Sequence, residues 1–212
     1  MIETIAGVQI PDSRIANDAA ELIRDTTTPL IYHHSRRVFL FGSLQSRKLG
    51  IQPDAELLYI AALFHDSGLV TPYRGTTQRF ELDSADTAKS FLTANGFSDA
   101  EADVVWTAIA LHTTPEVPYK MAPVIAATTA GVETDVLGIR LDSLSQNEID
   151  AVTAVHPRPD FKNEILQAFT DGFQERPDTT FGTVNADVLE HFVSNFHRID
   201  FVDVIKNSAW PE

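Results

Sequence analysis

The apolar residues of this chain recur mainly every three or four positions, which is the spacing of one face of an α-helix. Alternating runs of β-branched residues are few, and no Asn-Gly pair lies between two such runs. The pattern therefore predicts an all-α fold. Nine helices are expected, at about residues 15–24, 32–49, 54–67, 83–95, 98–111, 122–136, 145–156, 161–174 and 186–196.

Local signals set the boundaries of these helices. Ser98 with Glu101, and Ser145 with Glu148, have the spacing of a capping box, which marks a helix start. Asp83 is expected to cap the helix that begins beside it. The other predicted boundaries are Asp54 at a helix start, Gly50 and Gly96 just after helix ends, and a long polar loop at residues 69–82.

The composition excludes several classes of partner and site. The 212 residues carry 16 Lys+Arg against 30 Asp+Glu, a formal net charge of −14. A field of that sign repels phosphate backbones and anionic lipid, so neither nucleic acid nor a membrane is expected as a partner. Cysteine is absent, which excludes disulfides and thiolate ligands. Any bound metal must therefore be held by His, Asp or Glu.

No targeting or membrane segment is expected in the sequence. The first twelve residues contain Glu3 and Asp12 and lack a basic start followed by an apolar run. The longest weakly polar stretch, residues 121–132, is too short to span a bilayer. The default expectation is a cytoplasmic protein.

Four ionisable residues lie on otherwise apolar helix faces. His34 is followed by Val38 and Phe41, and His65 ends the apolar helix that leads into Asp66. By the same spacing, His112 follows Val105 and Ile109, and Asp135 follows Val124, Thr128 and Gly131. Burial of these groups costs free energy unless each has a partner. A shared metal ion would satisfy the whole set, and the alternative is that each residue has a private hydrogen bond in the core.

The order His34, His65-Asp66, Asp135 resembles the HD superfamily of metal-dependent hydrolases, whose pattern is H…HD…D. The residues that follow His34, Ser-Arg-Arg-Val, resemble the first motif of that family, and residues 61–68, AALFHDSG, resemble the second. The resemblance implies an all-α helical bundle formed by a single HD domain over residues 1–212. Its core is expected at about 29–140, with the C-terminal helices of 145–207 packed on it.

Further segments resemble the cyanamide hydratase-like subgroup of this superfamily. They are residues 79–86, RFELDSAD; residues 109–113, IALHT; residues 131–138, GVETDVLG; and the C-terminal NSAWPE of 207–212. The sequence departs from the subgroup at Ser84, where Gly is common, and at Glu133-Thr134, where a simpler apolar stretch is usual. These departures bear on the identity of the substrate and not on the metal site.

The resemblance implies a site and a reaction. His34, His65, Asp66 and Asp135 would bind a divalent metal, with Zn expected and Fe or Mn as alternatives. Asp66 would also accept a proton from water, and His112 would bind substrate or donate a proton. Glu81 would orient these groups or pair with Arg79. The reaction implied is hydration of a small nitrile, cyanamide, to urea.

Three other functions are considered. An HD phosphohydrolase acting on a nucleoside monophosphate or similar ester would use the same metal ligands, with Arg74 and Arg79 as its main cations. A dinuclear-iron oxygenase needs two further His between Asp66 and Asp135, where only His112 occurs. A non-catalytic binding module is disfavoured because all four ligands are present. The expected partner is a small molecule, and the late helices are compatible with a homo-oligomer.

Overall fold

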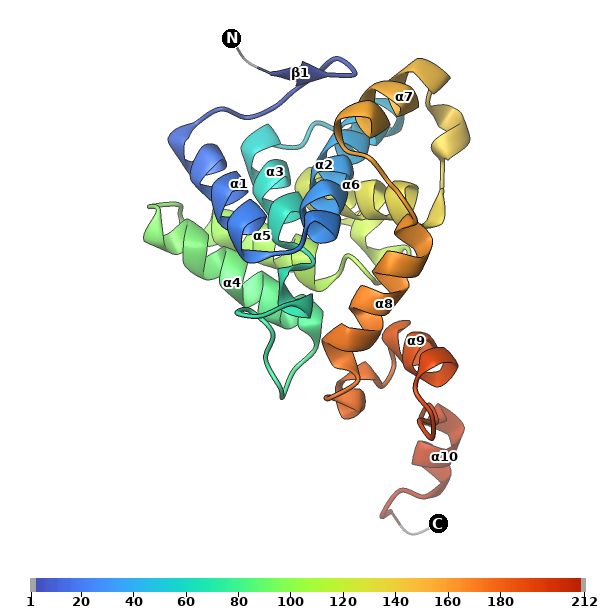
Figure 1. The fold of residues 1–212 in the computed structure, drawn as a ribbon. Helices are drawn as coiled ribbons and strands as arrows, with labels where there is room; N and C mark the ends of the chain where they lie inside the picture. Colours follow the sequence, from blue (N-terminus) through green and yellow to red (C-terminus); the bar gives the residue numbers. More distant parts are fainter. Residues whose placement is uncertain (1–2, 211–212) are drawn as a thin grey trace.

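The computed structural model describes residues 3–210 and shows an all-α fold, which confirms the predicted class (Figure 1). Each of the nine predicted helices has a counterpart. The α-helices are α1 (Arg14–Thr26), α2 (Pro29–Leu49), α3 (Ala55–Phe64), α4 (Phe80–Ala94), α5 (Asp99–Ala110), α6 (Pro123–Val132), α7 (Gln146–Val155), α8 (Phe161–Phe173), α9 (Asn185–Phe192) and α10 (Phe201–Lys206). The 3₁₀ helices are η1 (Ser67–Leu69), η2 (Val117–Lys120), η4 (Leu141–Ser143) and η5 (Pro177–Thr180), and η3 (Glu133–Leu137) is a π-helix. Pro211 and Glu212, the end of the C-terminal motif, lie outside the described residues.

A hairpin of two short strands and the helix α10 are among the elements that the sequence pattern does not predict. Strands β1 (Thr4–Ile5) and β2 (Val8–Gln9) form a small antiparallel hairpin. Strands of two residues are too short to show alternation, and the turn Ala6-Gly7 is recognisable only from its positive φ angles of 50° and 74°. Helix α10 has apolar residues at adjacent positions and so lacks a single apolar face.

Several predicted boundaries are confirmed. Both capping boxes are present, at Ser98 and at Ser145, with reciprocal hydrogen bonds to Glu101 and Glu148. Asp54 caps α3 by accepting a hydrogen bond from the backbone of Leu57. Helix α2 ends at Gly50, whose φ of 68° lies in the left-handed region.

The prediction that Asp83 caps a helix is wrong. Helix α4 already begins at Phe80, so Asp83 lies within its first turn. Its Oδ2 accepts a hydrogen bond of 2.8 Å from the backbone of Gly75 and also pairs with the buried guanidinium of Arg176. Asp83 therefore ties the polar loop and the C-terminal region to α4. The capping prediction is wrong because the carboxylate of Asp83 instead serves as the counterion of Arg176, which is buried and lies far away in the sequence.

A close crossing of α2 over α6 forms the centre of the core. A Cβ atom on Gly42 would lie 2.6 Å from the carbonyl oxygen of Ala127, and one on Gly131 would clash with the carbonyl oxygen of Val38. The two helix backbones are thus in direct contact, which only Gly allows. This contact brings the start of α2 next to the residues that follow α6.

The C-terminal helices form a second apolar cluster beside the first. Helix α8 packs against η1 and α2, and α9 packs against α8. The buried members of this cluster are Ile31, Leu69, Phe80, Phe161, Ile165, Phe173 and Leu189. Helix α10, in contrast, projects from this end of the molecule and leaves all its side chains exposed (Figure 1). Within residues 3–210, no helix combines the length and the apolar character that crossing a membrane requires.

The crossing of α2 and α6 makes Gly131→Ala destabilising. Helix propensity alone favours Ala over Gly by about 1 kcal/mol. The added methyl group would instead clash with backbone atoms of α2, so we expect a loss of about 1–3 kcal/mol in the free energy of unfolding. Urea denaturation measures this loss. Ser90→Ala, at an exposed position within α4, is the control and should change stability little. Equal stability of Gly131→Ala and the unchanged protein would contradict the crossing.

Candidate metal centre

Four buried ionisable residues come together beside the crossing of α2 and α6. His34 lies near the start of α2, and His65 and Asp66 follow directly from α3. His112 follows the end of α5. Each of these side chains is at most 3% exposed. Three helices that are separate in sequence therefore place three imidazoles and one carboxylate in one volume.

The Nε2 atoms of the three imidazoles surround the carboxylate of Asp66. His34 Nε2 and His65 Nε2 each lie 3.4 Å from Oδ2 of Asp66, and His112 Nε2 lies 3.5 Å from Oδ1. The Nε2 atoms of His34 and His65 are 3.1 Å apart. Two lone pairs at that separation repel each other unless a proton or a cation lies between them.

The opposite nitrogen of each ring is held by a hydrogen-bond acceptor. His65 Nδ1 donates to the carbonyl oxygen of Ala62 at 2.8 Å, and His112 Nδ1 donates to that of Ile109 at 2.6 Å. His34 Nδ1 donates to Oδ2 of Asp135 at 2.7 Å. These acceptors favour the tautomer with the proton on Nδ1, which leaves the Nε2 lone pair directed at Asp66. This is the arrangement that ligating histidines adopt in metal sites.

The carboxylate of Asp66 is an unsatisfied buried charge. Both of its oxygens are buried and lack a hydrogen-bond partner among the described residues. Burial raises the pKa of Asp66, but the imidazoles of His65, His112 and His34 outweigh burial and hold this pKa well below its usual range. The carboxylate is therefore ionised, and its burial costs free energy unless a cation is close.

These residues fit a divalent metal. The ligand atoms of His34, His65 and Asp66 all lie within 4.8 Å of one another. Burial lowers the pKa of His65 to about 3, so its ring is neutral at pH 7, as a ligand must be. Imidazole and carboxylate donors suit Zn, Fe or Mn. A cation in this position would satisfy the unpartnered carboxylate oxygens of Asp66 and would remove the repulsion between the Nε2 lone pairs of His34 and His65.

Asp135, predicted as a fourth ligand, faces a different set of groups. Its Oδ1 accepts hydrogen bonds from Nε of Arg37 at 2.8 Å and from Nε of Arg158 at 3.0 Å. Its Oδ2 accepts from His34 and from Nη2 of Arg37 at 2.9 Å. Burial raises the pKa of Asp135, and His34 and Arg37 lower it far more. The direct ligand role stays a prediction, and these contacts favour a role in orienting His34.

Glu81 is fully buried at the edge of the same site. Its carboxylate receives hydrogen bonds from Arg79 at 2.9 Å, from Thr113 at 2.7 Å and from Asn185 at 3.0 Å. Burial raises its pKa, and Arg79 with the neighbouring His112 shifts it below the usual value instead. Glu81 thus joins α4 to α9 and to the turn after His112. The expected pairing with Arg79 is present, whereas its catalytic role stays a prediction.

Ser84, which departs from the subgroup pattern, supports the HD turn. Its buried hydroxyl accepts a hydrogen bond of 2.8 Å from the backbone N–H of Gly68, two residues after Asp66. A Cβ at Gly68 would lie 2.9 Å from the Cβ of Asp83 and would clash with the carbonyl of Phe80. The turn that presents His65 and Asp66 is therefore fixed against α4.

A cavity of about 210 Å³ opens from the cluster. Its walls are mostly apolar and come from the ends of α5, α6, α8 and α9. His34, His65, Asp66 and His112 lie at its base. The other polar side chains that line it are Thr113, Thr114, Glu133 and Asn185. Glu133 is held at this wall by a hydrogen bond of 2.5 Å from the hydroxyl of Tyr119.

Several residues that support the cluster from a distance have no counterpart among the sequence predictions. Arg37 and Arg158 bracket Asp135, and Asn185 reaches Glu81 from α9. His156, which follows α7, is buried, and its Nδ1 lies 3.1 Å from Nδ1 of His33. One signal was available, because Arg37 is an arginine one turn after His34 on the same helix face. The others are more than twenty residues from their partners and have no local signature.

The contacts of Asp135 predict a large effect of Arg37→Met. Arg37 is 1% exposed, and its removal would leave a buried carboxylate with fewer partners. Breaking a buried ion pair from one side costs about 3–5 kcal/mol. Because Arg158 and His34 remain, we expect a loss of about 3 kcal/mol in the free energy of unfolding, measured by urea denaturation. Lys48→Met, an exposed change on the same helix, should cost less than about 0.5 kcal/mol. Similar losses in both variants would refute the role of this pair.

Comparison with known proteins agrees with the geometry of the site. No curated protein matches the chain in sequence. The sequence model described as "HD domain" matches residues 31–151, a range that contains the three histidines, Asp66 and Asp135. The match covers more than half of the chain and the whole of the cluster. The chain therefore belongs to the HD domain family.

Proposed function

We propose that this protein is a metal-dependent hydratase that adds water to a small nitrile, with cyanamide as the substrate and urea as the product. The HD domain and the His-His-Asp cluster support a metal-dependent activity of the hydrolase type. The observation that carries the proposal is the buried carboxylate of Asp66, whose oxygens lack a hydrogen-bond partner among residues 3–210 while three imidazole Nε2 atoms face it. A cation is the group that satisfies all of these atoms together.

His34, His65 and Asp66 would hold the metal, and His112 is placed to join them. A bound divalent metal supplies Lewis acidity and makes hydroxide available near neutral pH. His112 Nδ1 donates to the carbonyl of Ile109, and this hydrogen bond favours the tautomer with a lone pair, and not a proton, on Nε2. This geometry favours ligation or proton acceptance by His112 over the proton donation expected from the sequence. Asp135 would hold the ring of His34 and raise its basicity.

The cavity supports a small, uncharged substrate. Its volume of about 210 Å³ is below the roughly 300 Å³ at which pockets for drug-sized ligands begin. Among the described residues that line it, none is Lys or Arg, and Glu133 adds a carboxylate. A phosphate ester would meet no cationic side chain there. These features favour cyanamide over the nucleoside monophosphate of the rival hypothesis.

A polar group in the cavity wall suits the amino end of cyanamide. The carboxylate of Glu133 can accept hydrogen bonds from the substrate amino group. The mostly apolar walls of the cavity limit the access of bulk water to the cluster at its base. In the overall reaction one water adds across the carbon–nitrogen triple bond. Its oxygen bonds to carbon, both of its protons end on nitrogen, and nothing else is consumed.

The proposal predicts that His65→Ala removes the metal and the activity together. We expect metal content, measured by elemental analysis of the purified protein, to fall from about one ion per chain to a trace. Urea release from cyanamide should fall by more than about 100-fold, because loss of even an outer partner of a ligand costs roughly 10–100-fold. The loss of stability should be modest.

His191→Ala is the matched control, because His191 is exposed on α9 away from the cluster. This variant should keep both metal and activity. Metal content unchanged in His65→Ala would overturn the metal centre itself. Full metal content in the unchanged protein with no urea release would refute the substrate alone, and phosphate release from a nucleoside monophosphate would then identify the rival reaction.

A further inference from the structure

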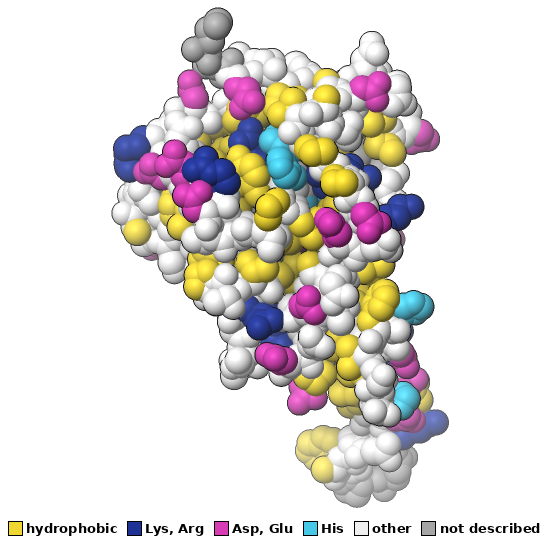
Figure 2. All heavy atoms as spheres, in the orientation of Figure 1, with side chains coloured by type: hydrophobic (Ala, Val, Ile, Leu, Met, Phe, Trp, Pro, Cys, Tyr) yellow, Lys and Arg dark blue, Asp and Glu magenta, His cyan; other side chains and the backbone are white. Residues whose placement is uncertain are grey.

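The C-terminal segment, residues 193–210, exposes an unusual number of large apolar side chains. Helix α10 projects from the body beyond α9 (Figure 1), and apolar surface is visible at the tip of this projection (Figure 2). Phe201 is 65% exposed and Trp210 is 86% exposed. The large apolar side chains exposed in and next to this segment are Phe192, Ile199, Phe201, Val202, Val204, Ile205 and Trp210.

Helix α10 lacks the contacts that would stabilise it within one chain. It has only six residues, and isolated helices shorter than about 12 residues are marginal in water. None of its side chains is buried. Apolar residues that remain exposed in a contiguous group mark an interaction surface. The segment therefore requires a partner.

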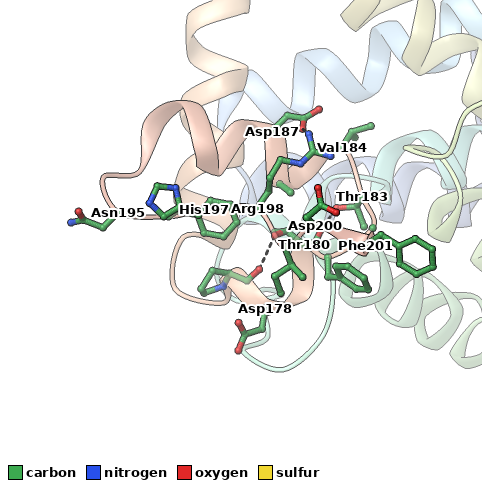
Figure 3. Close-up of a pocket in the computed structure, with 16 residues that line it drawn as sticks. Asp178, Thr180, Thr183, Val184, Asp187, Asn195, His197, Arg198, Asp200 and Phe201 are labelled. Carbon is green, nitrogen blue, oxygen red and sulfur yellow. Dashed lines mark hydrogen bonds and ion pairs between the residues drawn. The ribbon is translucent and has the colours of Figure 1, made fainter. Parts of the chain in front are cut away.

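A groove lies beside α10 and is large enough to receive an apolar helix. Its volume is about 980 Å³, and it lies between η5, α9 and the chain that leads to α10 (Figure 3). Its lining is mixed: the large apolar side chains include Phe181, Val184, Phe196 and Phe201, and the charged ones are Asp178, Asp187, Arg198 and Asp200. Val184, just before α9, lines both the groove and the metal cavity, and Asn185 and Val188 of α9 line the metal cavity alone.

We propose that the C-terminal segment is a homodimer interface, in which α10 of each copy packs into the groove of the other. One chain carries both the apolar helix and a groove lined in part by large apolar side chains, so a two-fold exchange pairs these side chains and closes the assembly. In such a dimer both α10 helices and both grooves are covered, whereas a monomer would expose its α10 helix and its groove to water.

The exposed area agrees with what a dimer needs. Phe192, Phe201 and Trp210 are 49%, 65% and 86% exposed, and aromatic side chains of about 150–250 Å² then offer on the order of 400 Å². A standard interface buries about 800 Å² on each partner. The three aromatic residues alone thus supply about half of one partner's share.

The charges of the segment favour a second copy over a membrane. Arg198 and Lys206 are balanced by Asp200 and Asp203, so the segment is neutral. A neutral arm can approach another copy of a chain of net charge −14 without local repulsion. Attraction to anionic lipid would require an excess of Lys and Arg, which residues 193–210 lack.

The test is the mass of the protein in solution, measured by light scattering after size exclusion at micromolar concentration. We expect twice the chain mass for the unchanged protein and a single chain mass for the double variant Phe201→Asp/Ile205→Asp. Both positions are exposed, so the far-ultraviolet circular dichroism should be nearly unchanged. Val155→Asp, the same kind of change at an exposed position on α7, is the control and should remain dimeric.

Two results would overturn this interface. One is a monomeric unchanged protein, and the other is a double variant that still has twice the chain mass. Sedimentation of a monomer with phosphatidylcholine vesicles would show that a lipid surface covers the segment instead. Metal content and urea release are measured on the same samples, so failure of the dimer is distinguished from failure of the proposed hydratase.

Discussion

The structure depends on one constraint, a buried carboxylate that finds no hydrogen-bond donor in the described part of the chain. Asp66 is 1% exposed, and three imidazole Nε2 atoms surround it at 3.4–3.5 Å. Backbone carbonyls fix two of these rings, and the carboxylate of Asp135 fixes the third. These hydrogen bonds hold the proton of each ring on Nδ1 and so favour an Nε2 lone pair, and not an N–H, facing the buried carboxylate. A metal cation makes that arrangement favourable.

The close crossing of α2 and α6 serves the same arrangement. Gly42 and Gly131 bring the two backbones into contact, and Asp135, four residues after Gly131, then reaches His34 and Arg37. A larger residue at the crossing would separate the helices and lengthen these hydrogen bonds. Packing of the core and orientation of a ligand are therefore coupled through two positions that carry no side chain.

The negative charge of the chain bears on two places, the metal cavity and the C-terminal segment. The metal cavity has a carboxylate at its wall and no cationic side chain among its described lining residues, which favours a small neutral substrate. Arginines occur around it, but Arg37, Arg158 and Arg79 are each paired with a carboxylate of the site. The C-terminal segment, which is neutral and apolar, is the part of this acidic surface best suited to contact another copy.

The sequence by itself predicted nine of the helices and grouped His34, His65, Asp66 and Asp135 as ligands, with His112 beside them. Helical periodicity and capping residues are local, and a polar residue on an apolar face is visible within one turn. Only the tertiary structure decided that Asp135 contacts His34 and two arginines, that Asp83 binds Arg176 instead of capping α4, and that Asn185 reaches Glu81. These contacts join residues far apart in the chain, and they depend on how helices cross, which no local pattern encodes.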